Sequence, residues 1–131
     1  RRGFVEWMVG SLRKGKEITI FDDALFTPIT IWHLADEIEW IMGQDISGFL
    51  HIAGTDPVSK YDFCFRICEN LGLDTDLMRK GSIDNMSFKA RRSKDQTLDS
   101  TYYQNQTGRS LPSTEDTVEL ITKHFKDLAY S

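Results

Sequence analysis

Proline, cysteine and long apolar runs are all scarce in this sequence of 131 residues. Its three prolines and nine glycines are too few for a collagen-like or low-complexity chain. The longest mostly apolar stretch, residues 29–42, is interrupted by Asp36, Glu37 and Glu39, so we expect no membrane-spanning helix and no membrane partner. A composition of 40% hydrophobic and 27% charged residues is instead typical of one globular domain, which we place over residues 1–131.

An excess of basic charge is also missing. Sixteen Lys and Arg residues stand against twenty Asp and Glu residues, which gives a net charge of −4. Proteins that bind nucleic acids usually draw much of their affinity from cations that displace counterions from phosphates, so we expect no nucleic-acid partner. The one basic cluster is long enough to contact one or two phosphates and consists of Lys89, Arg91, Arg92 and Lys94.

The two cysteines, Cys64 and Cys68, lie four residues apart on the apolar side of a predicted helix. This is not the arrangement of a disulfide framework, and neighbouring thiols that stay reduced indicate a cytoplasmic protein. The first residues contain neither the apolar segment nor the cleavage site of a secretory signal. Because the sequence begins without Met and almost directly on an amphipathic helix, we expect it to be a piece of a longer protein.

Motifs that carry chemistry are scarce as well. The sequence has no glycine-rich phosphate loop and no Gly-x-Ser-x-Gly nucleophile elbow. His33, His51 and His124 lack the spacing that metal sites favour. Residues 36–39 carry three acids that fall on the polar side of an amphipathic helix, where we expect water to solvate them. We therefore expect no catalytic, cofactor-binding or metal-binding residue within the chain.

Hydrophobic periodicity predicts an α/β order of elements. Apolar residues at three- and four-residue spacing predict four helices, over residues 3–14, 31–42, 58–71 and from about 113 onward. Runs of β-branched and apolar residues predict strands over residues 17–21 and 49–54, and the second run is apolar enough for burial on both faces. Residues 22–28 are predicted to form a loop, and the pattern between residues 73 and 99 is weak, with one or two short extended pieces.

The helix boundaries and buried faces can also be predicted. Thr30 and Ser59 have the side chains of N-caps, and Gly15, Gly43 and Gly72 stand where helices end. For the second helix we predict a buried face made of Leu34, Ala35, Ile38, Ile41 and Met42. For the last helix we predict a buried face made of Val118, Ile121, Phe125 and Leu128.

Two segments combine residue types that could bind a ligand. Residues 22–30 follow a predicted strand and contain carboxylates, hydroxyls and an aromatic ring. Residues 90–99 contain guanidinium groups that could pair with phosphate oxygens, together with Asp95 and Gln96 for sugar hydroxyls. On composition alone, an ordinary loop and a solvated charge run are the simpler interpretations.

Specific motifs surround these two segments. Asp22 to Pro28 is followed by Ile29-Thr30 and then by His33-Leu34-Ala35. Gly48-Phe49-Leu50-His51-Ile52-Ala53-Gly54 precedes Val58-Ser59-Lys60-Tyr61-Asp62-Phe63, and Ala90, Arg92, Leu98 and Asp99 come later. With these motifs, nearly the whole chain resembles the C-terminal portion of an extended short-chain dehydrogenase/reductase, most of all the dTDP-4-dehydrorhamnose reductase family.

The resemblance implies a fold and a function. The fold is the C-terminal substrate-binding portion of an extended short-chain dehydrogenase of Rossmann type, without its N-terminal dinucleotide-binding part. The parent enzyme would transfer a hydride from NAD(P)H to the keto carbon of a nucleotide-linked deoxysugar. The family's glycine-rich loop and Tyr-x-x-x-Lys pair would lie upstream, because no Tyr of this chain is followed by Lys four residues later. The chain alone would then be inactive and bind no cofactor.

The resemblance also implies roles for individual residues. Arg92 would bind the nucleotide diphosphate, Phe26, Thr27 and Pro28 would shape the sugar or base pocket, and Asp22 and Thr30 would orient the loop. Met8, Leu12 and the strand at residues 49–53 would pack against the absent dinucleotide-binding domain. Without that domain, we expect self-association or marginal stability.

Two alternatives remain open at this point. The same C-terminal portion occurs in epimerases and dehydratases of the superfamily, whose chemistry is set upstream. Some reductase-like proteins also act as non-catalytic regulatory subunits. The upstream sequence would separate these possibilities, because an enzyme needs the glycine-rich loop and the Tyr-x-x-x-Lys pair.

Overall fold

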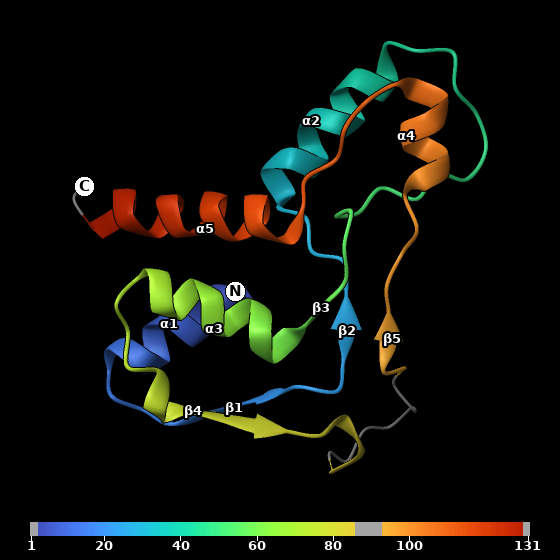
Figure 1. Cartoon of the computed structure of the whole chain (residues 1–131). Coiled ribbons are helices and arrows are strands. Elements are labelled where there is room, and N and C mark those ends of the chain that lie inside the picture. Colours follow the sequence, from blue (N-terminus) through green and yellow to red (C-terminus); the bar gives the residue numbers. More distant parts are fainter. Residues whose placement is uncertain (1–2, 86–92, 130–131) are drawn as a thin grey trace.

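The computed structural model describes residues 3–85 and 93–129, in which helices and short strands alternate (Figure 1). The α/β class predicted from the sequence is confirmed. The helices in these ranges are α1 (Phe4–Arg13), α2 (Ile31–Met42), α3 (Lys60–Asn70), α4 (Thr101–Thr107) and α5 (Thr114–Ala129). The strands are β1 (Ile18–Phe21), β2 (Leu25–Phe26), β3 (Val58–Ser59), β4 (Met78–Gly81) and β5 (Asp95–Gln96), with 3-10 turns at η1 (Thr75–Leu77) and η2 (Ile83–Asn85).

The main core lies between α1, α3, α5 and a parallel pair of strands, β1 and β4, in which Ile18 pairs with Met78. Helix α3 supplies most of its side chains and packs against both α5 and β1. Burial of each large apolar side chain in such a core stabilises the fold by about 1.5–3 kcal/mol. The core residues include Met8, Val9, Leu12, Ile18, Ile20, Tyr61, Phe63, Cys64, Ile67, Cys68, Met78, Val118 and Phe125.

The predicted apolar stripe of α1 faces this core. Met8 and Leu12 are 0% and 4% exposed, because they pack within the chain itself. The prediction that they contact an absent domain is therefore wrong. The exposed apolar side chains of α1 are Phe4 and Trp7. Gly15, with φ +73, follows the end of this helix in the left-handed conformation that glycine adopts without strain.

A second sheet forms around β2. Leu25 pairs with Ser59 of antiparallel β3 and with Asp95 of parallel β5. The prediction that residues 22–28 form only a loop is therefore wrong at β2. Two residues are too few to give a periodic signal, and their backbone partners come from segments that are remote in the sequence. The weak extended pieces expected between residues 73 and 99 correspond to β4 and β5.

Two predicted N-caps are confirmed. The Thr30 hydroxyl accepts a hydrogen bond of 3.1 Å from the His33 amide at the start of α2. The Ser59 hydroxyl accepts one of 3.0 Å from the Asp62 amide at the start of α3. Such a cap satisfies an amide that has no partner within the helix, and each typically contributes about 1 kcal/mol.

The predicted buried face of α2 is wrong. Ile38 and Met42 are 47% and 82% exposed, whereas Glu37, expected on the solvated side, is only 2% exposed. The reason is α4, which the sequence pattern did not predict and whose Tyr103 is buried. Leu128 of α5 is likewise exposed rather than buried.

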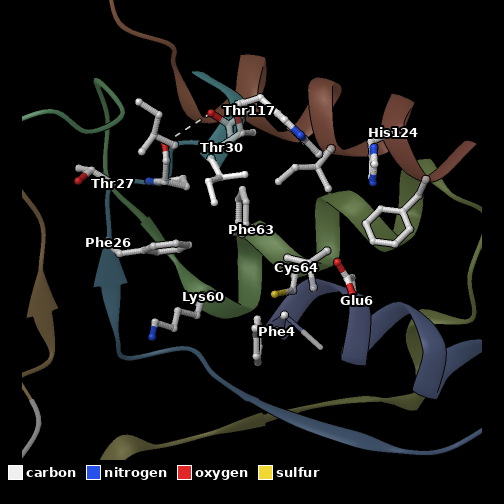
Figure 2. Close-up of a pocket in the computed structure, with 18 residues that line it drawn as sticks. Phe4, Glu6, Phe26, Thr27, Thr30, Lys60, Phe63, Cys64, Thr117 and His124 are labelled. Atoms are coloured by element: carbon white, nitrogen blue, oxygen red, sulfur yellow. Dashed lines mark hydrogen bonds between the residues drawn. The ribbon is translucent and has the colours of Figure 1, made fainter. Parts of the chain in front are cut away.

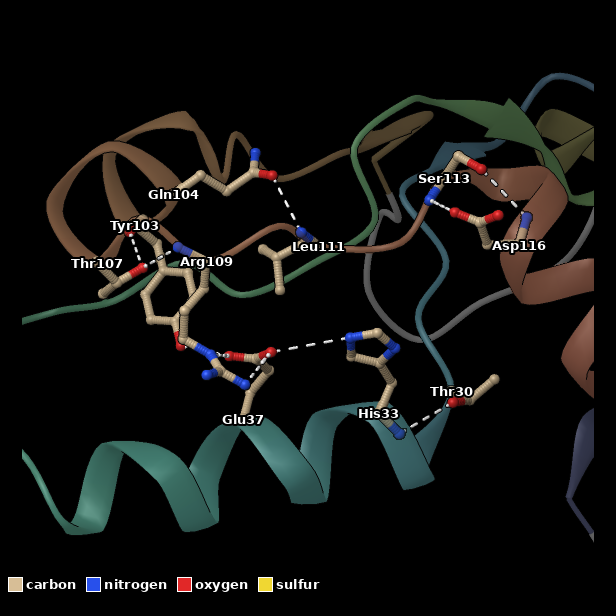
Figure 3. Close-up of polar contacts among 10 residues, drawn as sticks. All are labelled: Thr30, His33, Glu37, Tyr103, Gln104, Thr107, Arg109, Leu111, Ser113 and Asp116. Carbon is tan, nitrogen blue, oxygen red and sulfur yellow. Dashed lines mark hydrogen bonds and ion pairs between the residues drawn. The ribbon is translucent and has the colours of Figure 1, made fainter.

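The Glu37 side chain connects α2 to α4 and to the segment that follows α4 (Figure 3). Its carboxylate accepts hydrogen bonds of 2.6 Å from the Tyr103 hydroxyl and of 2.7 and 3.1 Å from the Arg109 guanidinium. Burial alone raises the pKa of Glu37, but the hydrogen bonds from Arg109 and Tyr103 outweigh burial, so this pKa lies below its ordinary value. The Arg109 guanidinium also lies 4.5 Å from the centre of the Trp40 ring.

The strand predicted at residues 49–54 is absent from the structure. Phe49 is 98% exposed, while Ala53 and Gly54 are buried. The Gly54 amide donates a hydrogen bond of 3.3 Å to the Thr27 carbonyl. A Cβ atom at Gly54 would lie 2.3 Å from the Pro28 carbonyl oxygen, so only glycine fits this contact. Among the described residues, no strand pairs with this segment.

Both cysteines are free and fully buried, as the sequence pattern predicted. Burial, together with the charge of a neighbouring ionised Cys68, raises the pKa of the Cys64 thiol to about 12. Burial raises the pKa of the Cys68 thiol to about 11. At neutral pH both thiols are therefore protonated and act as small apolar side chains.

We expect both thiols to resist Ellman's reagent at about pH 8 in the folded chain, because the thiolate is the reactive form. Addition of urea to the unfolding range should release both thiols for rapid reaction, which absorbance at the product's wavelength measures. A Cys64→Ser variant reports Cys68 alone. Rapid reaction of either thiol without denaturant would contradict the buried position of both.

We expect Glu37→Gln to lower the free energy of unfolding at pH 7 by about 1–3 kcal/mol, because Arg109 loses its anion. The folded-state pKa of Glu37 is lowered, so its contribution is present above the unfolded pKa and is lost as the pH falls through the folded value. The free energies of unfolding of wild type and variant, measured by urea denaturation, should therefore begin to converge as the pH falls below 4.5, the ordinary pKa of this group. They should become equal once the pH lies below the lowered pKa of Glu37 in the folded chain.

The matched control is Glu39→Gln, which changes an exposed acid on the same helix and should leave the unfolding curve at pH 7 unchanged. Equal stability of wild type and Glu37→Gln at pH 7 would show that the buried contacts of Glu37 do not stabilise the fold.

Candidate substrate-binding pocket

A cavity of about 630 Å³ lies between α1, α3, α5 and the segment that joins β2 to α2 (Figure 2). Its walls are mostly apolar, with hydroxyl groups from three threonines. This volume and this mixture of apolar walls with a few polar groups are typical of small-molecule sites. The residues that line it include Phe4, Glu6, Phe26, Thr27, Pro28, Thr30, Lys60, Phe63, Cys64, Thr117, Ile121, His124 and Phe125.

Four residues predicted from the resemblance lie together in this lining: Phe26, Thr27, Pro28 and Thr30. Phe26 belongs to β2, and its ring meets that of Phe63 edge to face at a centroid distance of 5.2 Å. The remaining three connect β2 to α2, and Thr30 caps that helix as described above. The structure therefore brings these four together at one wall.

Backbone hydrogen bonds and two hydroxyls fix this wall. The Thr27 hydroxyl accepts a hydrogen bond of 3.1 Å from the Leu98 amide, which follows β5. The Pro28 carbonyl accepts one of 3.5 Å from the Thr117 hydroxyl of α5, as Figure 2 shows. The wall is thus held by contacts with two later segments of the chain, and its shape does not depend on the loop alone.

Asp22, predicted to orient this loop, does not line the pocket. Its side chain is exposed, and its backbone amide donates to the Gly81 carbonyl at 3.1 Å. The neighbouring Asp23 provides the orienting carboxylate instead. It accepts hydrogen bonds of 2.6 Å from the Ser82 hydroxyl and 2.9 Å from the Ile83 amide. These bonds hold the pKa of Asp23 below its ordinary value. Two adjacent aspartates offer no sequence pattern that separates them, and the orienting role of Asp22 stays a prediction.

Arg92, the predicted ligand of the diphosphate, lies outside the described residues. The next basic residue, Lys94, precedes β5. Its ammonium lies 2.6 Å from the Asp84 carboxylate and 3.8 Å from that of Asp23. The described part of the second segment predicted to bind the ligand, from Ser93 onward, thus pairs through β5 with β2, which carries Phe26.

The sequence analysis did not assign three further residues that line the pocket, Lys60, Phe63 and Thr117. Lys60 and Phe63 stand in the motif that carries the resemblance, so the motif itself was the available signal. Thr117 lies on α5, where a single threonine near the start of a helix gives no such signal.

The arrangement is suited to binding. Among the described residues, no group of three or more His, Cys, Asp or Glu side chains is placed to hold a metal ion. The apolar walls can exclude water, and the threonine hydroxyls and the Lys60 ammonium offer polar contacts. None of the helices in the described ranges has the length and apolar character needed to cross a membrane.

The chain is similar in sequence to one reductase. It is 27% identical over 125 residues to the probable low-salt glycan biosynthesis reductase Agl14 of Haloferax volcanii. The alignment covers 95% of this chain and 42% of that protein.

Solved structures share the fold. The dTDP-4-dehydrorhamnose reductase of Clostridium acetobutylicum matches with a TM-score of 0.83 at 20% identity, over 98% of this chain and 45% of that one. The corresponding reductase of Bacillus anthracis, solved in complex with NADP, matches with a TM-score of 0.82 at 19% identity. That match covers 91% of this chain and 42% of the other. The chain thus spans less than half the length of these relatives.

The predicted fold is therefore confirmed, because the chain has the fold of part of these reductases. The family model of the RmlD substrate binding domain matches residues 1–127, and the chain belongs to this family.

Proposed function

We propose that the chain forms the substrate-binding side of an NAD(P)H-dependent nucleotide-sugar reductase, and that the pocket beside Phe26 receives a nucleotide-linked deoxysugar. The observation that carries the proposal is the lining of the pocket. Phe26, Thr27, Pro28 and Thr30, which the resemblance predicts as site residues, share one wall of a cavity large enough for a small molecule. Membership of a substrate-binding family supports the same reading.

The chain contributes binding and orientation. The apolar wall formed by Phe26 and Phe63 excludes water from one side of the ligand. Arg92 remains the proposed ligand of the diphosphate, because a guanidinium pairs with two phosphate oxygens at once. When bound, NAD(P)H supplies the hydride, and the NADP in the Bacillus anthracis relative supports this choice of cofactor. We place the cofactor site and the catalytic Tyr and Lys on the dinucleotide-binding half, so this chain alone is inactive.

A second surface fits that absent half. Ile31, Ile38 and Met42 of α2 are 75%, 47% and 82% exposed. We call these three residues the α2 apolar surface. In Figure 1, α2 starts beside α5, where the Trp32 ring meets that of His124, and its later turns extend away from the core formed by α1, α3 and α5. Residues 49–52, which pair with no strand among the described residues, follow α2 in the chain. We propose that the dinucleotide-binding half covers both. The length of the relatives, more than twice that of this chain, supports this partner.

The two alternatives differ from this proposal only upstream. An epimerase or dehydratase, or a regulatory subunit, could carry the same substrate-binding part. A reductase is favoured because the relative found by sequence is named a reductase, and because solved reductases match with TM-scores of 0.82 and 0.83, against 0.72 for the dTDP-glucose 4,6-dehydratase of Bacillus anthracis. The cytoplasmic location inferred from the reduced thiols stays a prediction.

We expect the chain to bind dTDP in isothermal titration calorimetry, and Arg92→Ala to weaken binding by about 1.5–3 kcal/mol, the usual contribution of a charge-assisted contact. Phe26→Ala should weaken binding as well, because the ligand loses its apolar wall. Phe49→Ala is the matched control, since this phenylalanine is fully exposed and outside the pocket lining. Affinity that neither Arg92→Ala nor Phe26→Ala changes would remove both residues from the site.

We expect the isolated chain to self-associate through the α2 apolar surface, because such patches drive association. Sedimentation velocity should show larger species for wild type and mainly monomer for Ile38→Glu combined with Met42→Glu. Leu120→Glu, a change at a partly exposed leucine of α5, serves as the control and should leave the association unchanged. A stable monomeric wild type would contradict the proposal that a partner domain normally covers this surface.

A further inference from the structure

The backbones of two basic residues that are 34 positions apart, Lys60 and Lys94, meet at one end of the second sheet. The Lys60 amide donates a hydrogen bond of 3.0 Å to the Ala24 carbonyl. The amide of Leu25, the residue after Ala24, donates a hydrogen bond of 2.7 Å to the Lys94 carbonyl. The start of α3 and the start of β5 therefore lie on either side of the same point of β2. Figure 1 shows the same arrangement, with β5 beside β2 and β3 leading into α3.

The charges of these two lysines have different surroundings. The Lys94 ammonium pairs with the carboxylates of Asp84 and Asp23. Within residues 3–85 and 93–129, Lys60 forms no salt bridge with a carboxylate. Its ammonium lies 5.8 Å from the centre of the Phe26 ring, a cation–π distance. The Lys60 ammonium thus lies over an aromatic ring, and no carboxylate in the described part of the chain forms a salt bridge with it.

Lys60 also lines the pocket and is half-buried. Figure 2 shows its side chain beside Phe26, on the side of the pocket that β2 forms. The acid in the lining, Glu6, comes from α1. An anion held near Phe26 would therefore meet a cation with no competing carboxylate partner, and attraction between the two is stronger where water is partly excluded.

Resting on the proposed function, we propose that Lys60 is a specificity-determining residue of this pocket and that its ammonium binds a phosphate oxygen of a nucleoside diphosphate. The basic cluster in the sequence does not include this lysine, which reaches the pocket only because β3 pairs with β2. Phe26 would hold the lysine in place and form the apolar wall for the rest of the ligand.

The test compares dTDP, dTMP and thymidine as ligands of the whole chain by titration calorimetry. We expect Lys60→Met to weaken dTDP binding about 10- to 150-fold, the range for loss of a charge-assisted contact. Thymidine, which has no phosphate, should bind the variant and wild type equally. Lys60→Arg should keep most of the dTDP affinity. Added salt should reduce the difference in dTDP affinity between wild type and Lys60→Met, because salt screens the attraction between the ammonium and the phosphate.

The matched control is Lys80→Met. Lys80 also lies over an aromatic ring, 5.1 Å from the centre of Tyr61, but it is outside the pocket lining. The Lys80→Met variant should bind dTDP with the same affinity as wild type. Circular dichroism should confirm that all variants fold.

The outcomes separate this inference from the proposed function. If wild type binds dTDP and Lys60→Met binds it equally well, the role of Lys60 is wrong and the proposed function stands. Equal weakening of dTDP and thymidine by Lys60→Met would also overturn it, because the lysine would then act through packing. If wild type binds none of the three ligands, the proposed function fails and this inference fails with it.

Discussion

The pairing of two backbone residues, Leu25 and Phe26, is the constraint on which the pocket depends. Strand β2 lies between β3 and β5, so these two residues join two later parts of the chain, one more than 30 positions further on and the other 70. Without this pairing, Phe26 would have no fixed orientation, and the starts of α3 and β5 would have no common anchor. The strand is short, but its neighbours supply hydrogen bonds on both of its edges. A very small amount of regular structure therefore positions most of the site.

Much of the fold could be predicted because its signals are local. Thr30 and Ser59 cap helices through bonds to residues three positions away, and that spacing is visible in the sequence. The stripe of Met8 and Leu12 follows from the helical period, although its partner was misjudged. A periodic stripe tells which side of a helix is buried, and it does not tell which surface covers it.

Where local signals mislead, long-range contacts are the reason. Glu37 is buried because Tyr103 and Arg109, more than 60 positions later, satisfy its carboxylate. No hydrophobicity pattern can predict such a charge in the interior. Of the apolar residues that the pattern assigned to the buried face of α2, three are exposed, and Leu34 and Ile41 are half-buried. For the site, the family motif found four residues of the pocket wall but not the orienting role of Asp23, which depends on Ser82 and Ile83.

The contact at Gly54 links two regions of the molecule. Its amide bonds to Thr27, and its missing side chain leaves room for the Pro28 carbonyl. The segment that precedes Gly54 is thereby attached to the wall of the pocket through the contacts of Gly54 with Thr27 and Pro28. A side chain at this position would displace Pro28, which lines the cavity. It would therefore change the shape of the cavity, although residue 54 itself does not line it. Glycine at position 54 is thus required for the position of Pro28 in the pocket wall.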